Sequence, residues 1–439
     1  MPAEGTFLGD FARAHGAGSE AHELGYLAAA VPLVGAVAGP WLRISWGMHQ
    51  EMCHVWVMSV GRSALSHRTT IASGVRDGVR RMRTITDDKL RMGRPTRASD
   101  AGLAEMLDAS EVETDEKGKL IELRVPIIPP GWMLELGELA PLLSAGGGTG
   151  GYREHLRELL LQVYDGILRS DTKQTKVPEQ PVSVSILGNI TEEDFEKVVG
   201  DFSMISSGFL GRWVPMLVPV SGKRCPEPSA NGTRPAGYEA VERHLDALAM
   251  LVKTATPVDN VWARASPEAR QLRRDWYAAT HPDDRSWDGY DAAHRKPLSS
   301  LWGRWQGTQI KLAVIHALSR EARQIDAFYE LEVSAGDVAW SIAVVEQAWA
   351  MTRKALPEAA DQTTIHGRAE ELVARALDRA GGQLPLRRLT ERLKTSKGNP
   401  VTRRDVRQAV EALAALGEVV VGGPDDGDGG SMVALRRAS

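Results

Sequence analysis

The chain has 439 residues, enough for roughly two or three domains, and 25% of them are charged. Its formal net charge of −4 gives no general positive field, so contact with nucleic acid would need a local basic patch. Cys53 and Cys225 show no metal-ligand spacing and fit a reducing, cytoplasmic compartment, and no basic segment of a secretion signal precedes the first apolar stretch. Residues 27–42 are apolar but contain Pro32 and Pro40, which favours a buried helical hairpin over a membrane span.

Residues 1–50 are predicted to be helical, and they lead into a short apolar run at residues 55–60. This run is rich in β-branched residues, which predicts a buried strand. The segment GRSALSHRTT (residues 61–70) follows as a loop, and residues 71–91 have helical character. A strand, a loop of small residues and a helix start together form a phosphate cradle, in which backbone amides and the helix dipole face an anion. An ordinary strand–turn–helix corner is the alternative.

The loop departs from the standard P-loop motif GxxxxGK[ST]. Ser66 stands where a second glycine is expected, His67 is one extra residue, and Arg68 replaces the lysine. Thr69 and Thr70 retain the hydroxyl groups, of which Thr69 is the candidate Mg²⁺ ligand. The predicted nucleotide-binding residues are Gly61, Ser63, Ser66, Arg68, Thr69 and Thr70.

A second buried strand is predicted at residues 132–136, after a helix that begins near residue 101 and a polar surface loop at 111–119. P-loop enzymes place an Asp-Glu pair at such a strand end, with Asp in the Mg²⁺ shell and Glu orienting water. Here Gly137 occupies the Asp position and Glu138 remains. Glu135 shares a strand face with Gly137 and is a substitute for it, or else a partly exposed strand residue.

Two further strands carry polar residues at their ends. Residues 181–188 alternate and predict a third strand followed by Asn189, which is either a sensor of the γ-phosphate or a turn residue. An amphipathic helix at 152–167 precedes it. Residues 214–220 predict a fourth strand, and Arg212 on the preceding loop could reach a phosphate in the same subunit or in a neighbour.

The remaining chain is mainly helical. Helices are predicted at residues 239–253, 266–280, 298–318 and 335–353. His316 lies in an apolar stripe of the third of these, together with Lys311, and is expected to be a core histidine with a satisfied partner.

The last segment predicts a winged helix, with helices at 365–380, 386–393 and 402–416 and a hairpin of residues 418–421 and 432–435. Its second and third helices are strongly basic, which predicts DNA binding through phosphate contacts. The wing tip is acidic and winged helices also bind proteins, so a protein contact is the alternative. The predicted DNA-binding residues are Arg387, Arg388, Arg392, Lys394, Arg403, Arg404 and Arg407.

In this order the segments resemble a large, poorly characterised family of helicase-like P-loop proteins from phages, plasmids and genomic islands. Many members are known only as a domain of unknown function, and they often lie beside a primase-polymerase or are fused to one. The matching segments are VWVMSVGRSALSHRTT, ASDAGLAEML, WMLELGELAPLL, VYDG, SILGNIT and SGFLGRW, between about residues 20 and 350. Their order is more specific than any single motif.

The resemblance implies an α/β fold with a RecA/AAA-like P-loop core, and ATP and Mg²⁺ as ligands. Arg68 takes the place of the phosphate-binding lysine, Thr69 that of the Mg²⁺ hydroxyl, Glu138 that of the catalytic glutamate, Asn189 that of the sensor and Arg212 that of an arginine finger. The implied divisions are a helical segment at 1–50, the core at 51–222, a helical region packed on it at 237–353 and the winged helix at 365–439.

Two functions follow from these expectations. The first is a DNA-dependent, helicase-like ATPase of a mobile element with weak hydrolysis, acting as a ring or filament with DNA and a primase-polymerase as partners, away from membranes. The second is a non-hydrolysing scaffold or regulator that binds DNA and proteins through its winged helix. Arg68 and Gly137 favour the second function, whereas Thr69, Glu138, Asn189 and Arg212 favour the first.

Overall fold

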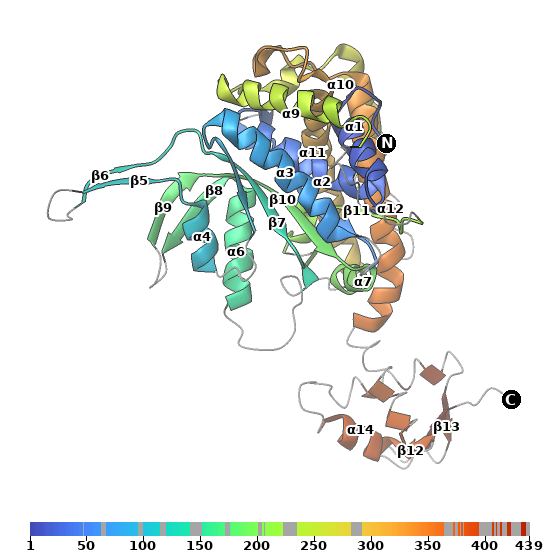
Figure 1. The fold of residues 1–439 in the computed structure, drawn as a ribbon. Coiled ribbons are helices and arrows are strands. Elements are labelled where there is room, and N and C mark those ends of the chain that lie inside the picture. The colour runs from blue at the N-terminus through green and yellow to red at the C-terminus, as the bar shows by residue number, and fades with distance from the viewer. Residues whose placement is uncertain are drawn as a thin grey trace, which may run out of the picture. The chain divides into compact units, whose positions relative to one another are not determined.

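The computed structural model divides the chain into two compact units, Met1–Val198 with Phe202–Met351 and Val199–Asp201 with Thr352–Ser439 (Figure 1). The residues that the structure describes are 1–46, 48–62, 67–94, 100–114, 120–140, 152–171, 176–200, 204–205, 207–222, 235–281, 292–363, 372–373, 376–377, 379–380, 382–394, 406–407, 410, 413–414, 419–422 and 432–435.

A parallel sheet, five-stranded in the described part of the chain, forms the centre of the first unit and confirms the α/β class. Its strands are β3 (Trp56–Val60), β4 (Leu90–Gly93), β7 (Gly131–Leu136), β10 (Ser183–Ile190) and β11 (Trp213–Leu217), in the spatial order β11-β3-β10-β7-β4. Every residue of β3 and β10 is buried. Parallel strands covered on both faces are nearly continuous apolar runs. The four strands predicted from such runs are confirmed.

The predicted single helix over residues 71–91 is wrong at its end. The helix α3 (Arg68–Thr86) stops at Asp87, which adopts a left-handed φ of 47°, and Asp88 follows with a φ of 60°. Aspartate tolerates this conformation better than most residues. The chain then reverses, and the strand β4 pairs Leu90 with Gly131 of β7.

Three antiparallel hairpins were not predicted. β1 (Arg43–Trp46) pairs with β2 (His49–Met52), so the expectation of helix throughout residues 1–50 is wrong for its last part. β5 (Glu111–Thr114) pairs with β6 (Leu120–Arg124), so part of the predicted loop at 111–119 is a strand. β8 (Ile167–Asp171) pairs with β9 (Lys176–Pro181).

Helices cover both faces of the sheet (Figure 1). α2 (Glu23–Ala38) is buried on nearly all sides and crosses β3, β7 and β10, beneath α1 (Phe7–Ala17), α3 and α11 (Ala292–Glu321). A side chain at Gly35 would place its Cβ 2.7 Å from the hydroxyl of Ser185, so glycine lets α2 lie close to the sheet. On the other face, α4 (Asp100–Leu107) contacts α6 (Tyr152–Tyr164). Among the described helices, none is both long and apolar enough to cross a bilayer.

The predicted helices of residues 239–353 are confirmed. The structure gives α9 (Tyr238–Lys253), α10 (Pro267–Ala279), α11 and α12 (Ala335–Thr363), with α7 (Glu192–Gly200) and the 3₁₀ turns η1 (Leu210–Arg212), η2 (Val261–Arg264) and η3 (Phe328–Glu330) elsewhere in the chain. His316 is buried, and its Nδ1 lies 2.6 Å from an oxygen of Asp337. The expectation of a satisfied core histidine is therefore confirmed.

The second unit contains a small antiparallel sheet, three-stranded in the residues described, in the order β12-β14-β13. Its elements are β12 (Gln383–Pro385), α14 (Leu386–Lys394), β13 (Val419–Gly422) and β14 (Met432–Leu435). The predicted hairpin and second helix are confirmed, whereas the short strand β12 was not predicted. An apolar cluster that includes Val373, Leu389, Val410 and Val433 forms the core of this unit.

Candidate functional site

The candidate site lies at the carboxyl edge of the central sheet, between the ends of β3 and β10. The amide of Gly61 donates to the carbonyl of Ile190 at 3.2 Å, which holds the two strand ends together. β3 leads through α3 to β4, three places away in the sheet, whereas β10 leads through α7 to β11, two places away in the opposite direction. Because such crossovers are right-handed, the two connections leave the sheet on opposite faces. Ligands of open α/β sheets bind in the crevice that this divergence creates.

The start of α3 presents a helix N-terminus at this crevice. His67 precedes the helix with a φ of 47°, and its Nδ1 lies 2.9 Å from a carboxylate oxygen of Glu20. Arg68, Thr69 and Thr70 form the first turn, which contains no acidic residue, and the side chain of His67 does not cap it. No carboxylate in the first turn therefore neutralises the positive end of the helix dipole. This leaves the helix N-terminus able to attract an anion. Ser63 and Ser66 of the predicted loop lie outside the described residues.

The acidic first turn of α7 lies beside the arginines that flank the loop. The Nε atom of Arg62 lies 3.9 Å from a carboxylate oxygen of Glu192. The pKa of Asp194 is held below its usual range mainly by its hydrogen bond with Lys197, and the charge of Arg68 contributes to the same shift. Asp194 thus lies within electrostatic range of Arg68.

The end of β7 contributes Gly137 and Glu138, and both residues are exposed. A Cβ built on Gly137 meets no atom within 4 Å, so a larger side chain fits there. The amide of Leu139 donates to the carbonyl of Asn189 at 2.8 Å, which holds this segment against the end of β10. Asn189 is buried and lies in register with Ser59 of β3. The fold therefore brings Gly61, Glu138 and Asn189 to one edge of the sheet.

Glu135 lies deeper in β7 and is buried in the sheet. Its Oε1 lies 3.4 Å from Nε of Arg94, which follows β4. Its Oε2 is buried and has no hydrogen-bond partner among the residues that the structure describes. Glu135 is therefore an interior ion-pair residue with one oxygen left for a further ligand.

Arg212 is not brought to this edge. It directly precedes β11, whose first residue, Trp213, pairs with Trp56 at the start of β3, so Arg212 lies at the amino edge of the sheet. The side chain is buried, with one nitrogen 3.0 Å and 3.2 Å from the carboxylate oxygens of Asp165 and another 3.0 Å from the carbonyl of Gly208. Within one subunit, Arg212 and Gly61 at the end of β3 are at opposite edges of the sheet.

The predicted DNA-binding residues lie on the second unit. Arg387, Arg388 and Arg392 are exposed on α14, and Arg387 pairs with Glu391 at 3.3 Å. Lys394 is the last residue of that helix, and Arg407 is exposed on a helical segment. Arg403 and Arg404 lie outside the described residues.

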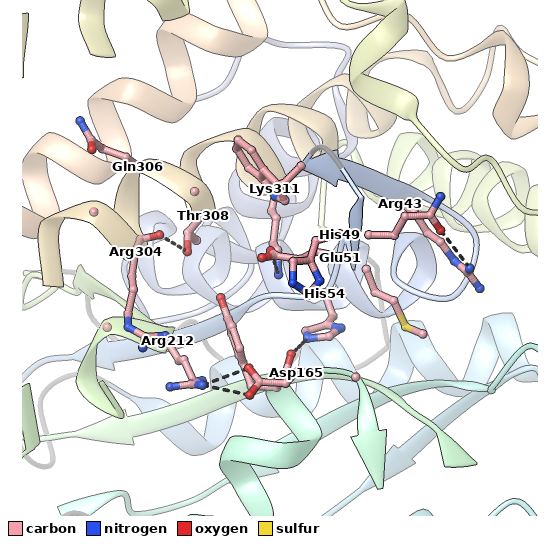
Figure 2. A pocket seen from close by; sticks show the side chains of 18 of the residues that line it. Arg43, His49, Glu51, His54, Asp165, Arg212, Arg304, Gln306, Thr308 and Lys311 are labelled. Atoms are coloured by element: carbon pink, nitrogen blue, oxygen red, sulfur yellow. Dashed lines mark hydrogen bonds and ion pairs between the residues drawn. The ribbon is translucent and has the colours of Figure 1, made fainter. Parts of the chain in front are cut away.

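A large pocket at the amino edge of the sheet was not predicted. Its volume is about 930 Å³, and Arg43, Arg304 and Lys311 line it together with Arg212 (Figure 2). The sequence offered one signal of this pocket, which is a lysine, Lys311, within an apolar stripe. In the structure Lys311 lies on α11 and is buried. A buried lysine needs a partner, and this one lies 3.2 Å from a carboxylate oxygen of Glu51.

The comparisons with known proteins add no identity. No protein-family model matches the chain, and a search of curated proteins finds no significant match.

Proposed function

We propose that the chain is a helicase-like P-loop protein of a mobile genetic element, which binds ATP, acts on DNA and hydrolyses the nucleotide weakly. The observation that carries this proposal is the meeting of the phosphate-loop strand, Asn189 and Glu138 at one edge of a parallel sheet. β10, in which Asn189 is the next-to-last residue, lies between β3 and β7. This arrangement and the uncapped start of α3 support a RecA/AAA-like P-loop core.

In this proposal the phosphates of ATP lie against the backbone amides at the start of α3. Arg68 neutralises phosphate charge, and the hydroxyl of Thr69 holds Mg²⁺, which supplies charge neutralisation between the phosphates. Glu138 orients the attacking water, and Asn189 hydrogen-bonds the γ-phosphate or that water. ATP bound in this way competes with Asp194 for the charge of Arg68, because the phosphates are the stronger anion.

Weak hydrolysis follows from two positions. Gly137 provides no carboxylate to hold the water shell of Mg²⁺. The guanidinium of Arg68 is planar and larger than the compact ammonium of the standard lysine. It therefore cannot take the same position against the phosphates. Neither change removes the amides that bind phosphate, so binding is expected to survive better than turnover.

The second unit is proposed to be a winged helix that binds DNA. A helix between the first two strands and a sheet order of β12-β14-β13 support this, together with the exposed arginines of α14. Such a basic helix gains affinity by displacing counterions from phosphates. The proposed partners are DNA, further copies of the chain in a ring or filament, and a primase-polymerase.

The alternative function is a non-hydrolysing scaffold or regulator. The exposed Gly137 favours it, because P-loop hydrolysis depends on a carboxylate at this position. The two functions share nucleotide and DNA binding and differ in turnover.

The test is ATP binding and phosphate release by the purified full-length chain, with and without single- and double-stranded DNA. Arg68→Ala should weaken ATP binding, whereas Arg80→Ala, an exposed arginine later on the same helix, is the matched control. Equal binding by wild type and Arg68→Ala would contradict the proposed site. Binding without DNA-stimulated release would favour the scaffold.

A further inference from the structure

The amino-edge pocket is formed where several strands begin. His54, Pro181 and Arg212 line it, and each stands just before β3, β10 or β11. The β1–β2 hairpin, the end of α6, α10 and α11 complete its walls. The pocket is thus separated by the length of the sheet from Gly61, where the predicted phosphate loop begins.

Positive charge dominates the pocket. Arg43, Arg212, Arg273, Arg304 and Lys311 line it against the carboxylates of Glu51 and Asp165. Lys311 pairs with Glu51 and Arg212 with Asp165, and Figure 2 shows these two pairs close together in the pocket. Among the residues described, Arg43, Arg273 and Arg304 form no ion pair, so their charges have no matching carboxylate.

Several charged donors in this pocket lack partners. The Nε atoms of Arg43, Arg212 and Arg273 are buried without a hydrogen-bond partner in the described structure. The Arg212 side chain as a whole is only 8% exposed. A buried donor without a partner is costly, and a charged one more so.

The arginines also repel one another. The pKa of the Arg304 guanidinium is lowered first by its partial burial and then by the charge of Arg212. An anion between these two side chains would remove the repulsion and satisfy the free donor of Arg212.

Aromatic rings accompany the charges. The ring of Tyr164 lies 5.3 Å from the guanidinium carbon of Arg212 and 4.8 Å from Nζ of Lys311. Arg273 lies 5.6 Å from the ring of Trp46 and 5.3 Å from that of Tyr277, and both rings are partly exposed. Rings with exposed edges beside a cationic wall suit a ligand that has both phosphates and a flat base.

We propose that this pocket binds a free nucleotide, with its phosphates between Arg212, Arg304 and Lys311 and its base against Trp46 or Tyr277. The volume of about 930 Å³ matches that of pockets for ligands of this size. Gly307 of α11 also lines the pocket, and a Cβ built on it meets no atom within 4 Å. The pocket therefore has free space beside this residue.

The experiment measures binding by calorimetry with the full-length chain in an Arg68→Ala, Thr69→Ala background, which disables the predicted loop. The probes are ATP and inorganic tripolyphosphate, which carry the same number of phosphates. ATP should still bind with one equivalent and more tightly than tripolyphosphate, because only ATP has a base to stack. Arg304→Gln in this background should weaken both by about 10-fold or more, the scale of one charge-assisted hydrogen bond.

Arg80→Gln is the control, because Arg80 is an exposed arginine outside the pocket. Arg304 is itself exposed, so its substitution should leave the melting temperature unchanged and the result interpretable. Loss of all ATP binding in the loop-deficient background would overturn the proposal, as would full affinity in Arg304→Gln. Equal affinity for the two probes would overturn the assignment to nucleotides. The proposed nucleotide site at the loop has its own test in the same data. It is refuted if wild type and the loop-deficient variant bind the same number of ATP molecules per chain.

Discussion

Restoring a carboxylate at the end of β7 tests the proposed hydrolysis site most directly. The substitutions are Gly137→Asp and Arg68→Lys together, which return both positions to the residue types that P-loop hydrolysis uses. Gly137 is exposed, its φ is not left-handed, and no atom lies within 4 Å of a Cβ built on it. The stability change should therefore be small, within about 0.5 kcal/mol, as for other exposed sites.

The expected gain in turnover is roughly 10-fold to 100-fold, the scale on which residues that support a metal site act. This corresponds to about 1.4 to 2.7 kcal/mol of transition-state stabilisation. The side chain at position 137 belongs to the same strand face as Glu135, whose register partner on β10 is Leu187, and Asn189 lies on that face of β10. The new carboxylate would thus face the same side of the sheet as the sensor.

The assay is steady-state phosphate release at saturating ATP and Mg²⁺, with melting temperatures recorded for every variant. Gly222→Asp provides a matched control, because it adds the same side chain at another exposed glycine with open space. Adding Glu138→Gln to the double variant should abolish the gain if Glu138 orients water. An ordinary wild-type rate that Glu138→Gln leaves untouched would refute this alignment of the strand, and Glu135 would become the residue to test.

Three further outcomes are expected. Burial alone would raise the pKa of Asp337, but hydrogen bonds led by that of His316 hold it below its usual range. The resulting stability is present above about pH 4 and is lost as the pH falls further, so Asp337→Asn should cost about 3 kcal/mol in urea unfolding at pH 7 and progressively less below pH 4. Arg388→Gln with Arg407→Gln should lower the salt slope of DNA binding by about one per lost phosphate contact, and an unchanged slope would indicate a protein-binding domain. The chain should self-associate with Arg212 of one copy facing the loop of the next, and a strict monomer at micromolar concentration with an ATP analogue and DNA would contradict this.

The central strands were predictable because they are buried on both faces, which makes each one a short apolar run. β4 was not, since Arg91 interrupts its apolar character and the helix before it ends at Asp87 and Asp88 rather than at glycine or proline. Candidate residues at the carboxyl edge were predictable from their position at strand ends, because parallel strands all end at the same edge.

The amino-edge pocket was not predictable from local patterns. Its charged residues come from segments as distant in sequence as Arg43, Asp165 and Arg304, and only the fold brings them together. The hairpin that contributes Arg43 was itself missed, because its strands are short and show no apolar run, and β2 is largely exposed.

The position of Arg212 connects the pocket with assembly. Its side chain is 8% exposed and is held by Asp165, so contact with a neighbour's phosphate requires this ion pair to open. Binding an anion in the pocket requires no such opening, because the Nε atom is already free. A ligand in the pocket should therefore hold Arg212 in place and compete with its use across a subunit boundary. Sedimentation with DNA and no nucleotide should show weaker self-association when pyrophosphate is added to wild type, and little change in Arg304→Gln. Self-association that pyrophosphate does not affect in wild type would show that the two roles do not share Arg212.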